Sequence, residues 1–173
     1  MDDPAGATAP SAALPDGLSS EGIRNDLPEG EETMLEHLGG RTKLKEFLHA
    51  FHAAVLADPL LSEMFARGKP THMAHLTTFF EEVMGGRQGY TERLGGVASL
   101  FDAHARLGIT EEQRQRFVDL LMTAADEVRL PDDARFRQSL RTRIDAGSKV
   151  STILSQPGAQ RLDPWPPVGR YEW

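Results

Sequence analysis

The sequence of 173 residues contains no cysteine, which excludes disulfide bonds and thiolate metal sites. It also has no basic excess, because 19 Lys and Arg stand against 26 Asp and Glu for a formal net charge of −7. A polyanion-binding domain needs positive charge to neutralise phosphates, so nucleic acid is not an expected partner. No apolar run approaches the roughly 18 residues of a membrane span, and the first residues lack the basic and apolar regions of a signal peptide. We therefore expect a cytoplasmic protein without a membrane partner.

The acidic residues and the prolines divide the chain in the same way. Residues 1–32 hold eight carboxylates and one base, so they account for the whole net charge, and the other 141 residues carry 18 charges of each sign. Eight of the 11 prolines lie in this first segment or after position 155. We predict a disordered acidic tail over 1–32, a folded domain over 33–155 and a proline-rich tail over 156–173. The last segment holds both tryptophans, Trp165 and Trp173, so a tail that folds back on the domain and a loose end are both open.

The central part of the chain shows the spacing of apolar residues that is typical of amphipathic helices, and it shows no strand alternation. Thr110, followed by Glu112 and Gln113, is an expected helix cap. Between residues 87 and 96 the glycines and polar residues indicate an irregular loop. The prediction is an all-α domain. The expected helices cover about 44–56, 60–65, 70–83, 97–105, 110–128 and 131–154.

Six histidines carry the most obvious site chemistry, because HExxH, Ser-His-Asp, phosphate-binding and calcium-loop patterns are all missing. His72 and His75 stand three residues apart on one helical face, a spacing that suits a metal ion, although no third ligand follows at a matching spacing. A zinc or other non-haem metal enzyme built on this pair is one alternative. His37 and His49 are expected at the surface. The six are His37, His49, His52, His72, His75 and His104.

His104 lies among apolar residues in the segment LFDAHARLGIT. A lone histidine of this kind is more often a hydrogen-bonded core residue than a ligand. Here His52 and His72 come from two other helices, which also present Phe51, Phe65, Leu76 and Phe79. One histidine opposite two others in an all-α domain is able to hold a flat apolar cofactor, and haem is the candidate.

Four stretches also occur in an order that matches a known family: HLGG, HAFHAAVLADPLL, EEVMGG followed by Tyr90, and LFDAHARLGITEEQRQRF. They resemble, in turn, the opening glycine turn, the second helix and its exit, the glycine pair and tyrosine after the distal helix, and the proximal histidine segment. From about Met34 to Gln156 the chain thus resembles the truncated haemoglobins, most closely group II. The resemblance implies a 2-over-2 globin fold in which two antiparallel helix pairs sandwich haem b.

The resemblance implies roles for individual residues. His104 matches the proximal ligand of the iron and is the expected metal ligand. Tyr90 and Arg93 lie where the propionates are often met, and no residue is assigned a catalytic role. The expected cofactor-binding residues are His104, Phe65, His72, Leu76, Tyr90, Arg93, Leu100 and Phe117, and those facing the bound ligand are His52, His72 and Phe117.

Two departures from the family pattern stand out. His52 occupies the position of a distal tyrosine, and Phe117 that of a tryptophan. Both usual residues donate hydrogen bonds to a bound ligand, so the donors here would be His52 and His72, and ligand stabilisation should depend on pH. Binding of His72 to the iron as a sixth ligand is an alternative to a five-coordinate resting state.

The implied function is reversible binding of O2 or another diatomic molecule such as CO or NO, as a ligand-binding or transport protein. NO detoxification or peroxide turnover is the oxidoreductase alternative, and it would need a separate electron donor. A monomer or a homodimer fits the sequence equally. A second class of function is a helical binding or sensor module that kept the globin fold without haem.

Overall fold

The structure, a computed structural model, describes residues 23–24, 31–161, 164–171 and 173. Most of the predicted disordered tail, residues 1–22 and 25–30, lies outside these described residues. Within them the chain forms eight helices and one antiparallel pair of two-residue strands. The helices are α1 (Met34–His37), α2 (Gly40–Ala57), α3 (Ser62–Ala66), α4 (His72–Val83), α5 (Gly89–Leu94), α6 (Gly96–His104), α7 (Glu111–Glu127) and α8 (Ala134–Leu154), and the strands are β1 (Ile23–Arg24) and β2 (Arg170–Tyr171).

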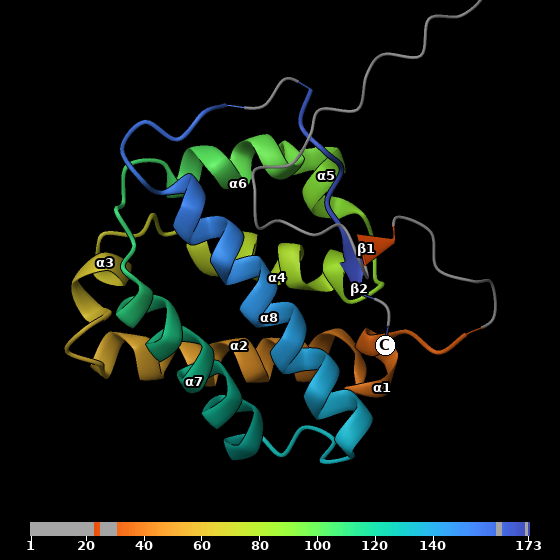
Figure 1. Cartoon of the computed structure of the whole chain (residues 1–173). Helices are drawn as coiled ribbons and strands as arrows, with labels where there is room; N and C mark the ends of the chain where they lie inside the picture. The colour runs from red at the N-terminus through yellow and green to blue at the C-terminus, as the bar shows by residue number, and fades with distance from the viewer. Residues whose placement is uncertain (1–22, 25–30, 162–163, 172) are drawn as a thin grey trace, which may run out of the picture.

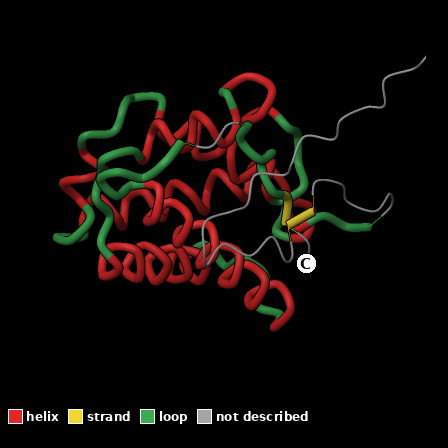
Figure 2. The backbone as a smooth tube through the Cα atoms, turned by 45° about the horizontal axis from the view of Figure 1, so that its top comes forward, coloured by secondary structure: helices red, strands yellow, loops and turns green. Residues whose placement is uncertain are grey.

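The long helices form two packed pairs. α2 packs against α4, and α7 packs against α8, while the contact between α2 and α7 joins the two pairs (Figure 1). α5 and α6 follow α4, and α6 also contacts α8. The small strand pair lies beside the C-terminus (Figure 2), and β2 contacts α4. The all-α prediction is confirmed, and the strand pair is an addition that no sequence pattern indicated. In the described part of the chain, no helix combines the length and apolar character that a membrane crossing requires.

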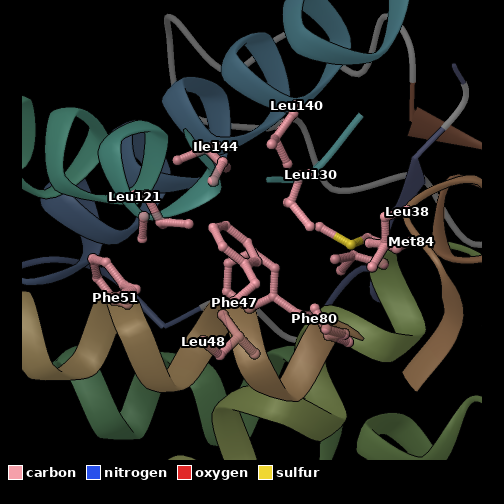
Figure 3. Close-up of a cluster of buried hydrophobic side chains, with 14 of the residues drawn as sticks. Leu38, Phe47, Leu48, Phe51, Phe80, Met84, Leu121, Leu130, Leu140 and Ile144 are labelled. Carbon is pink, nitrogen blue, oxygen red and sulfur yellow. The ribbon is translucent and has the colours of Figure 1, made fainter. Parts of the chain in front are cut away.

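The core lies between α2, α7 and α8 (Figure 3). Phe47 and Phe51 of α2 point toward Leu121 of α7 and Ile144 of α8. The apolar residues that follow helical spacing along α2 are almost all buried. Leu56 is the exception and is 43% exposed, because it is turned by about 100° from the buried face that ends at Val55. The fully buried residues of this face are Leu44, Phe47, Leu48, Phe51 and Val55.

Local caps begin the two helices of the second pair. Thr110 Oγ1 accepts a hydrogen bond from the backbone N–H of Gln113 at 3.2 Å, and the Gln113 side chain accepts one from the Thr110 N–H at 3.0 Å. This capping box starts α7 as predicted. Asp133 starts α8 in a similar way, since its Oδ1 accepts from the Phe136 N–H at 2.8 Å.

The irregular loop predicted between residues 87 and 96 is wrong, because α5 lies within it. The carboxylate of Glu82, only 2% exposed, accepts hydrogen bonds from the backbone N–H groups of Tyr90 at 2.8 Å and Thr91 at 2.9 Å. The Thr91 hydroxyl also donates to it. These groups lie at the start of α5, where N–H groups have no partner within the helix. The cap comes from the preceding helix α4, so no local sequence pattern reveals it.

α3 begins at Ser62 and not at about residue 60, where the sequence pattern placed the start of this helix. Asp58 explains the delay, because its Oδ1 accepts from the backbone N–H groups of Leu60 at 3.0 Å and Leu61 at 3.2 Å. Its Oδ2 accepts from Arg116 Nε of α7 at 2.6 Å. The turn that leads into α3, and so to Phe65, is thereby fixed to α7.

Candidate haem site

His104 is the last residue of α6, and a hydrogen bond holds its ring. Its Nδ1 lies 2.8 Å from the carbonyl oxygen of Leu100, one turn earlier. A carbonyl only accepts, so Nδ1 is the donor, and the neutral ring then carries a lone pair on Nε2. In the part of the chain that the structure describes, Nε2 has no hydrogen-bond partner. Burial lowers the pKa of His104, which favours this neutral form. The ring is therefore oriented and protonated as a metal-binding imidazole requires.

A second group of histidines lies on other helices. The rings of His52 on α2 and His72 on α4 have centroids 6.1 Å apart, and Phe65 of α3 packs edge-on to His72 at 5.7 Å. Nδ1 of His72 is buried and has no hydrogen-bond partner among the described residues. Burial lowers the pKa of His72, and the nearby titratable imidazoles of His52, His104 and His75 lower it further. His104 is thus within electrostatic reach of His72, although the two stand on different helices.

Three phenylalanines support this side of the site. Phe117 of α7 packs edge-on to Phe51 at a centroid distance of 5.0 Å and lies nearly parallel to Phe65 at 6.4 Å. Phe51 is fully buried, while Phe65 and Phe117 are half-buried. Phe117 therefore extends the aromatic cluster behind Phe65, the ring that contacts His72, and has no hydrogen-bond donor to offer. Phe51 enters the site only as the support of these two rings.

The remaining predicted site residues have fewer contacts with the histidines. Leu76 of α4 and Leu100 of α6 are half-buried and pack against the core. Tyr90 is buried with its ring 5.3 Å from Phe79, and this burial raises the pKa of its hydroxyl. Arg93 is exposed on α5. Within the described residues, no ring contact or hydrogen bond links Tyr90 or Arg93 to the histidines, so their role at the propionates stays a prediction.

The other three histidines differ from one another. His49 and His75 are exposed. His37 lies at the surface but is half-buried, because its ring lies between Glu32 and Asp133 and packs on Trp173. In the described part of the chain, no group of three or more His, Asp or Glu side chains is arranged to hold a metal ion, so His72 and His75 have no third protein ligand there.

The donor set fits haem. In one common arrangement, one neutral imidazole of the protein holds the haem iron, and a polar group near an apolar surface lies on the other side. His104 offers the first, and the unpartnered Nδ1 of His72 beside Phe65 offers the second. An all-α domain that brings one such histidine within electrostatic reach of histidines on separate helices is the arrangement expected of the globin class.

Comparisons with known proteins give the family. Residues 33–145 match the family model of the bacterial-like globins, and the chain belongs to the bacterial-like globin family. The comparison with curated proteins gives no match. Membership of this family supports haem-based binding of small ligands in general.

Solved structures of truncated haemoglobins share the fold. A haemoglobin from the thermophilic phototrophic bacterium Chloroflexus aurantiacus is 25% identical with a TM-score of 0.62, over 70% of this chain and 98% of that chain. One from the actinobacterium Thermobifida fusca is 26% identical with a TM-score of 0.61, over 70% and 97%. The group II truncated haemoglobin from Bacillus anthracis is 20% identical with a TM-score of 0.65, over 74% and 96%. The predicted truncated globin fold is confirmed, and a part of this chain has no counterpart in these structures.

Proposed function

We propose that the chain holds haem b through Nε2 of His104 and reversibly binds O2 or another diatomic molecule on the side of His52, His72 and Phe117. The observation that carries this proposal is the state of His104, whose Nδ1 donates to Leu100 while Nε2 keeps a free lone pair. When bound, haem supplies an iron atom that takes a diatomic ligand at its open coordination position. Family membership supports haem as the cofactor. The orientation of His104 supports its role as the iron ligand, and the neighbouring rings of His52 and His72 support their place on the ligand side.

The Leu100 carbonyl has a definite task in this proposal. It holds the proton of His104 on Nδ1 and prevents the ring from rotating about its own axis. Because the carbonyl belongs to the same helix, the direction of Nε2 depends on the position of α6 as a whole. A histidine whose second nitrogen is so bonded is also a better electron donor to a metal.

On the opposite side, the proposed task of His72 is to hydrogen-bond the ligand. A buried polar atom without a partner costs free energy, and a ligand with a complementary atom removes that cost. A neutral imidazole donates from one nitrogen only, so the tautomer decides which nitrogen meets the ligand. Phe65 and Phe117 keep water away from this side, which strengthens such a hydrogen bond.

Redox chemistry is an extension of the same proposal. NO detoxification or peroxide turnover at this site would need electrons from a separate donor. Binding of His72 to the iron as a sixth ligand would compete with the diatomic ligand, and spectroscopy separates the two states.

An absorption spectrum of the oxidised, reduced and CO-bound protein tests the proposal. Haem-loaded protein should show an intense Soret band that shifts with CO, and His104→Ala should abolish or severely weaken haem uptake. His49→Ala is the matched control, because His49 is an exposed histidine on α2. A stable protein that takes up no haem would contradict the proposal and favour a haem-less binding module. Six-coordinate ferric bands that vanish in His72→Ala would identify the sixth ligand.

A further inference from the structure

The helix that carries His104 is weakly anchored in the core. Of the nine residues of α6, only Gly96 and Phe101 are buried, whereas α2 buries five large side chains. Phe101 and His104 are three residues apart and so lie as neighbours on one side of the helix. The packing around Phe101 therefore has a direct effect on the direction of His104.

The end of the chain provides that packing. The C-terminal strap, defined here as residues 164–171 and 173, passes α6 and α5 on its way to β2 (Figure 1). The ring of Trp165 lies 4.9 Å from that of Phe101, which is only 8% exposed. Val168 is buried beside Gly96, the first residue of α6. Just before the strap, Arg161 pairs with Asp102 of α6 at 2.7 Å.

The strap is anchored independently of α6 at its far end. The guanidinium of Arg170 donates to the carbonyl oxygens of Gly85 at 2.7 Å and Gly86 at 2.9 Å, in the turn after α4. β2 pairs with β1, and the Trp173 indole N–H donates to the Glu32 carbonyl at 2.8 Å. These contacts hold the strap to the turn after α4 and to the segment before α1. The position of Trp165 against α6 is therefore supported by parts of the molecule other than α6 itself.

The contact of Trp165 is made by its ring and not by its N–H. Nε1 is buried without a hydrogen-bond partner in the described part of the chain. A buried donor without a partner is unfavourable, so the packing of the ring on Phe101 must offset that cost. Phenylalanine at this position would keep an aromatic ring and lose no hydrogen bond.

The strap lies outside the family match, which ends at residue 145. The solved haemoglobins are covered almost completely, at 96–98%, by 70–74% of this chain. We propose that Trp165 is a positioning residue that, through Phe101, fixes α6 and thereby the direction of Nε2 of His104. This inference rests on the proposed function, in which His104 holds the iron.

Two readouts on the full-length chain test the inference. In Trp165→Ala, hydrogen exchange of the α6 amides should be about tenfold faster, equivalent to about 1.4 kcal/mol of local stability. In the reduced haem protein, the iron–histidine stretching band in the resonance Raman spectrum should shift or broaden. Trp165→Phe should restore both readouts. Leu121→Ala is the control for a general loss of stability, because Leu121 is fully buried on α7, in the core between α2, α7 and α8.

The outcomes separate the two proposals. Unchanged exchange in α6 and an unchanged band in Trp165→Ala would overturn the positioning role. Equal effects of Trp165→Ala and Leu121→Ala on α6 would also overturn it, because they would show a general loss of stability. A wild-type chain that binds no haem would overturn the proposed function itself, and the exchange of α6 would then report only an ordering of the helix.

Discussion

His37 and His72 show two ways in which this chain surrounds an imidazole. Both nitrogens of His37 face carboxylates, with Nδ1 3.1 Å from Glu32 and Nε2 2.9 Å from Asp133. The hydrogen bond to Asp133, assisted by Glu32, raises the pKa of His37. His72 has aromatic neighbours and an unpartnered Nδ1, and burial lowers its pKa.

The difference separates a structural histidine from one available to a ligand. His37 uses its whole hydrogen-bonding capacity to join Glu32 to Asp133, the cap of α8, and its ring carries Trp173. Nδ1 of His72 has no hydrogen-bond partner among the described residues and lies beside aromatic rings. Such a group is free to bind a ligand. The number of histidines in a sequence therefore says less than the partners that the fold gives each one.

The largest expected effect comes from removing the apolar support of the His72 side. Phe51 is fully buried and carries the rings of Phe65 and Phe117. Phe51→Ala should lower the free energy of unfolding by about 3–5 kcal/mol, the usual cost of a large cavity. Urea denaturation measures this change. Leu56→Ala, at an exposed position of the same helix, should cost less than about 0.5 kcal/mol. Equal losses in the two variants would show that this side does not depend on packing.

A smaller effect is expected from the unpartnered imidazole itself. If His72 donates to the bound ligand, His72→Leu should speed O2 dissociation about tenfold, since one hydrogen bond contributes about 1–1.5 kcal/mol. The pH dependence of the dissociation rate should weaken with it. Stopped-flow measurements give both quantities. His75→Leu, one turn further and exposed, is the control, and an unchanged rate in His72→Leu would rule out the donor role.

His37 should act on stability and depend on pH in a defined direction. Its folded-state pKa is raised, so its contribution is fully present below the unfolded pKa of about 6.5 and is lost as the pH rises through the folded-state pKa. His37→Gln should therefore lower the melting temperature near pH 6 and have little effect above about pH 8. The effect should be at most about 1 kcal/mol, because both carboxylates are largely exposed.

The two histidines whose pKa values are lowered should show the opposite sign. The pKa values of His72 and His104 are lowered, so their contribution is present above about pH 6.5 and is lost as the pH falls through their folded-state pKa values. Thermal melts of His37→Gln and His72→Leu between pH 5 and 9 compare the two signs. A stability loss in His37→Gln that grows with pH would contradict the assignment for His37.

The smallest effect is expected from removing charge without removing contacts. Residues 1–22 contain four of the eight carboxylates of the acidic segment and precede β1, so their deletion leaves Glu32 and the strand pair in place. Haem uptake and the melting temperature should stay at the wild-type values. A changed Soret band in this variant would show that the acidic tail reaches the haem site.

Much of the fold followed from local patterns. The spacing along α2 and the Thr110 capping box each depend on residues within a few positions of one another, so both were predictable. α5 was missed because its cap, Glu82, belongs to the preceding helix. The hydrogen bond from His104 to Leu100 is also local, since it spans one helical turn, whereas the ring contacts of His72 join separate helices.

The partners of His37 were not predicted, for a related reason. Its partner Asp133 is 96 positions away, and Trp173 comes from the end of the chain. The residues next to His37 in the sequence carry no information about such distant neighbours. The pairing of Trp165 with Phe101 is equally distant in sequence, so only the folded chain reveals which side of α6 it covers.

Titration of the individual histidines by nuclear magnetic resonance tests the central contrast most directly. In the reduced, CO-bound protein, which is diamagnetic, each imidazole gives its own pH-dependent shift. The account predicts that His37 titrates above the ordinary pKa of about 6.5 and His72 below it. A pKa of His72 equal to or higher than that of His37 would contradict the claim that the fold keeps His72 neutral and without a partner.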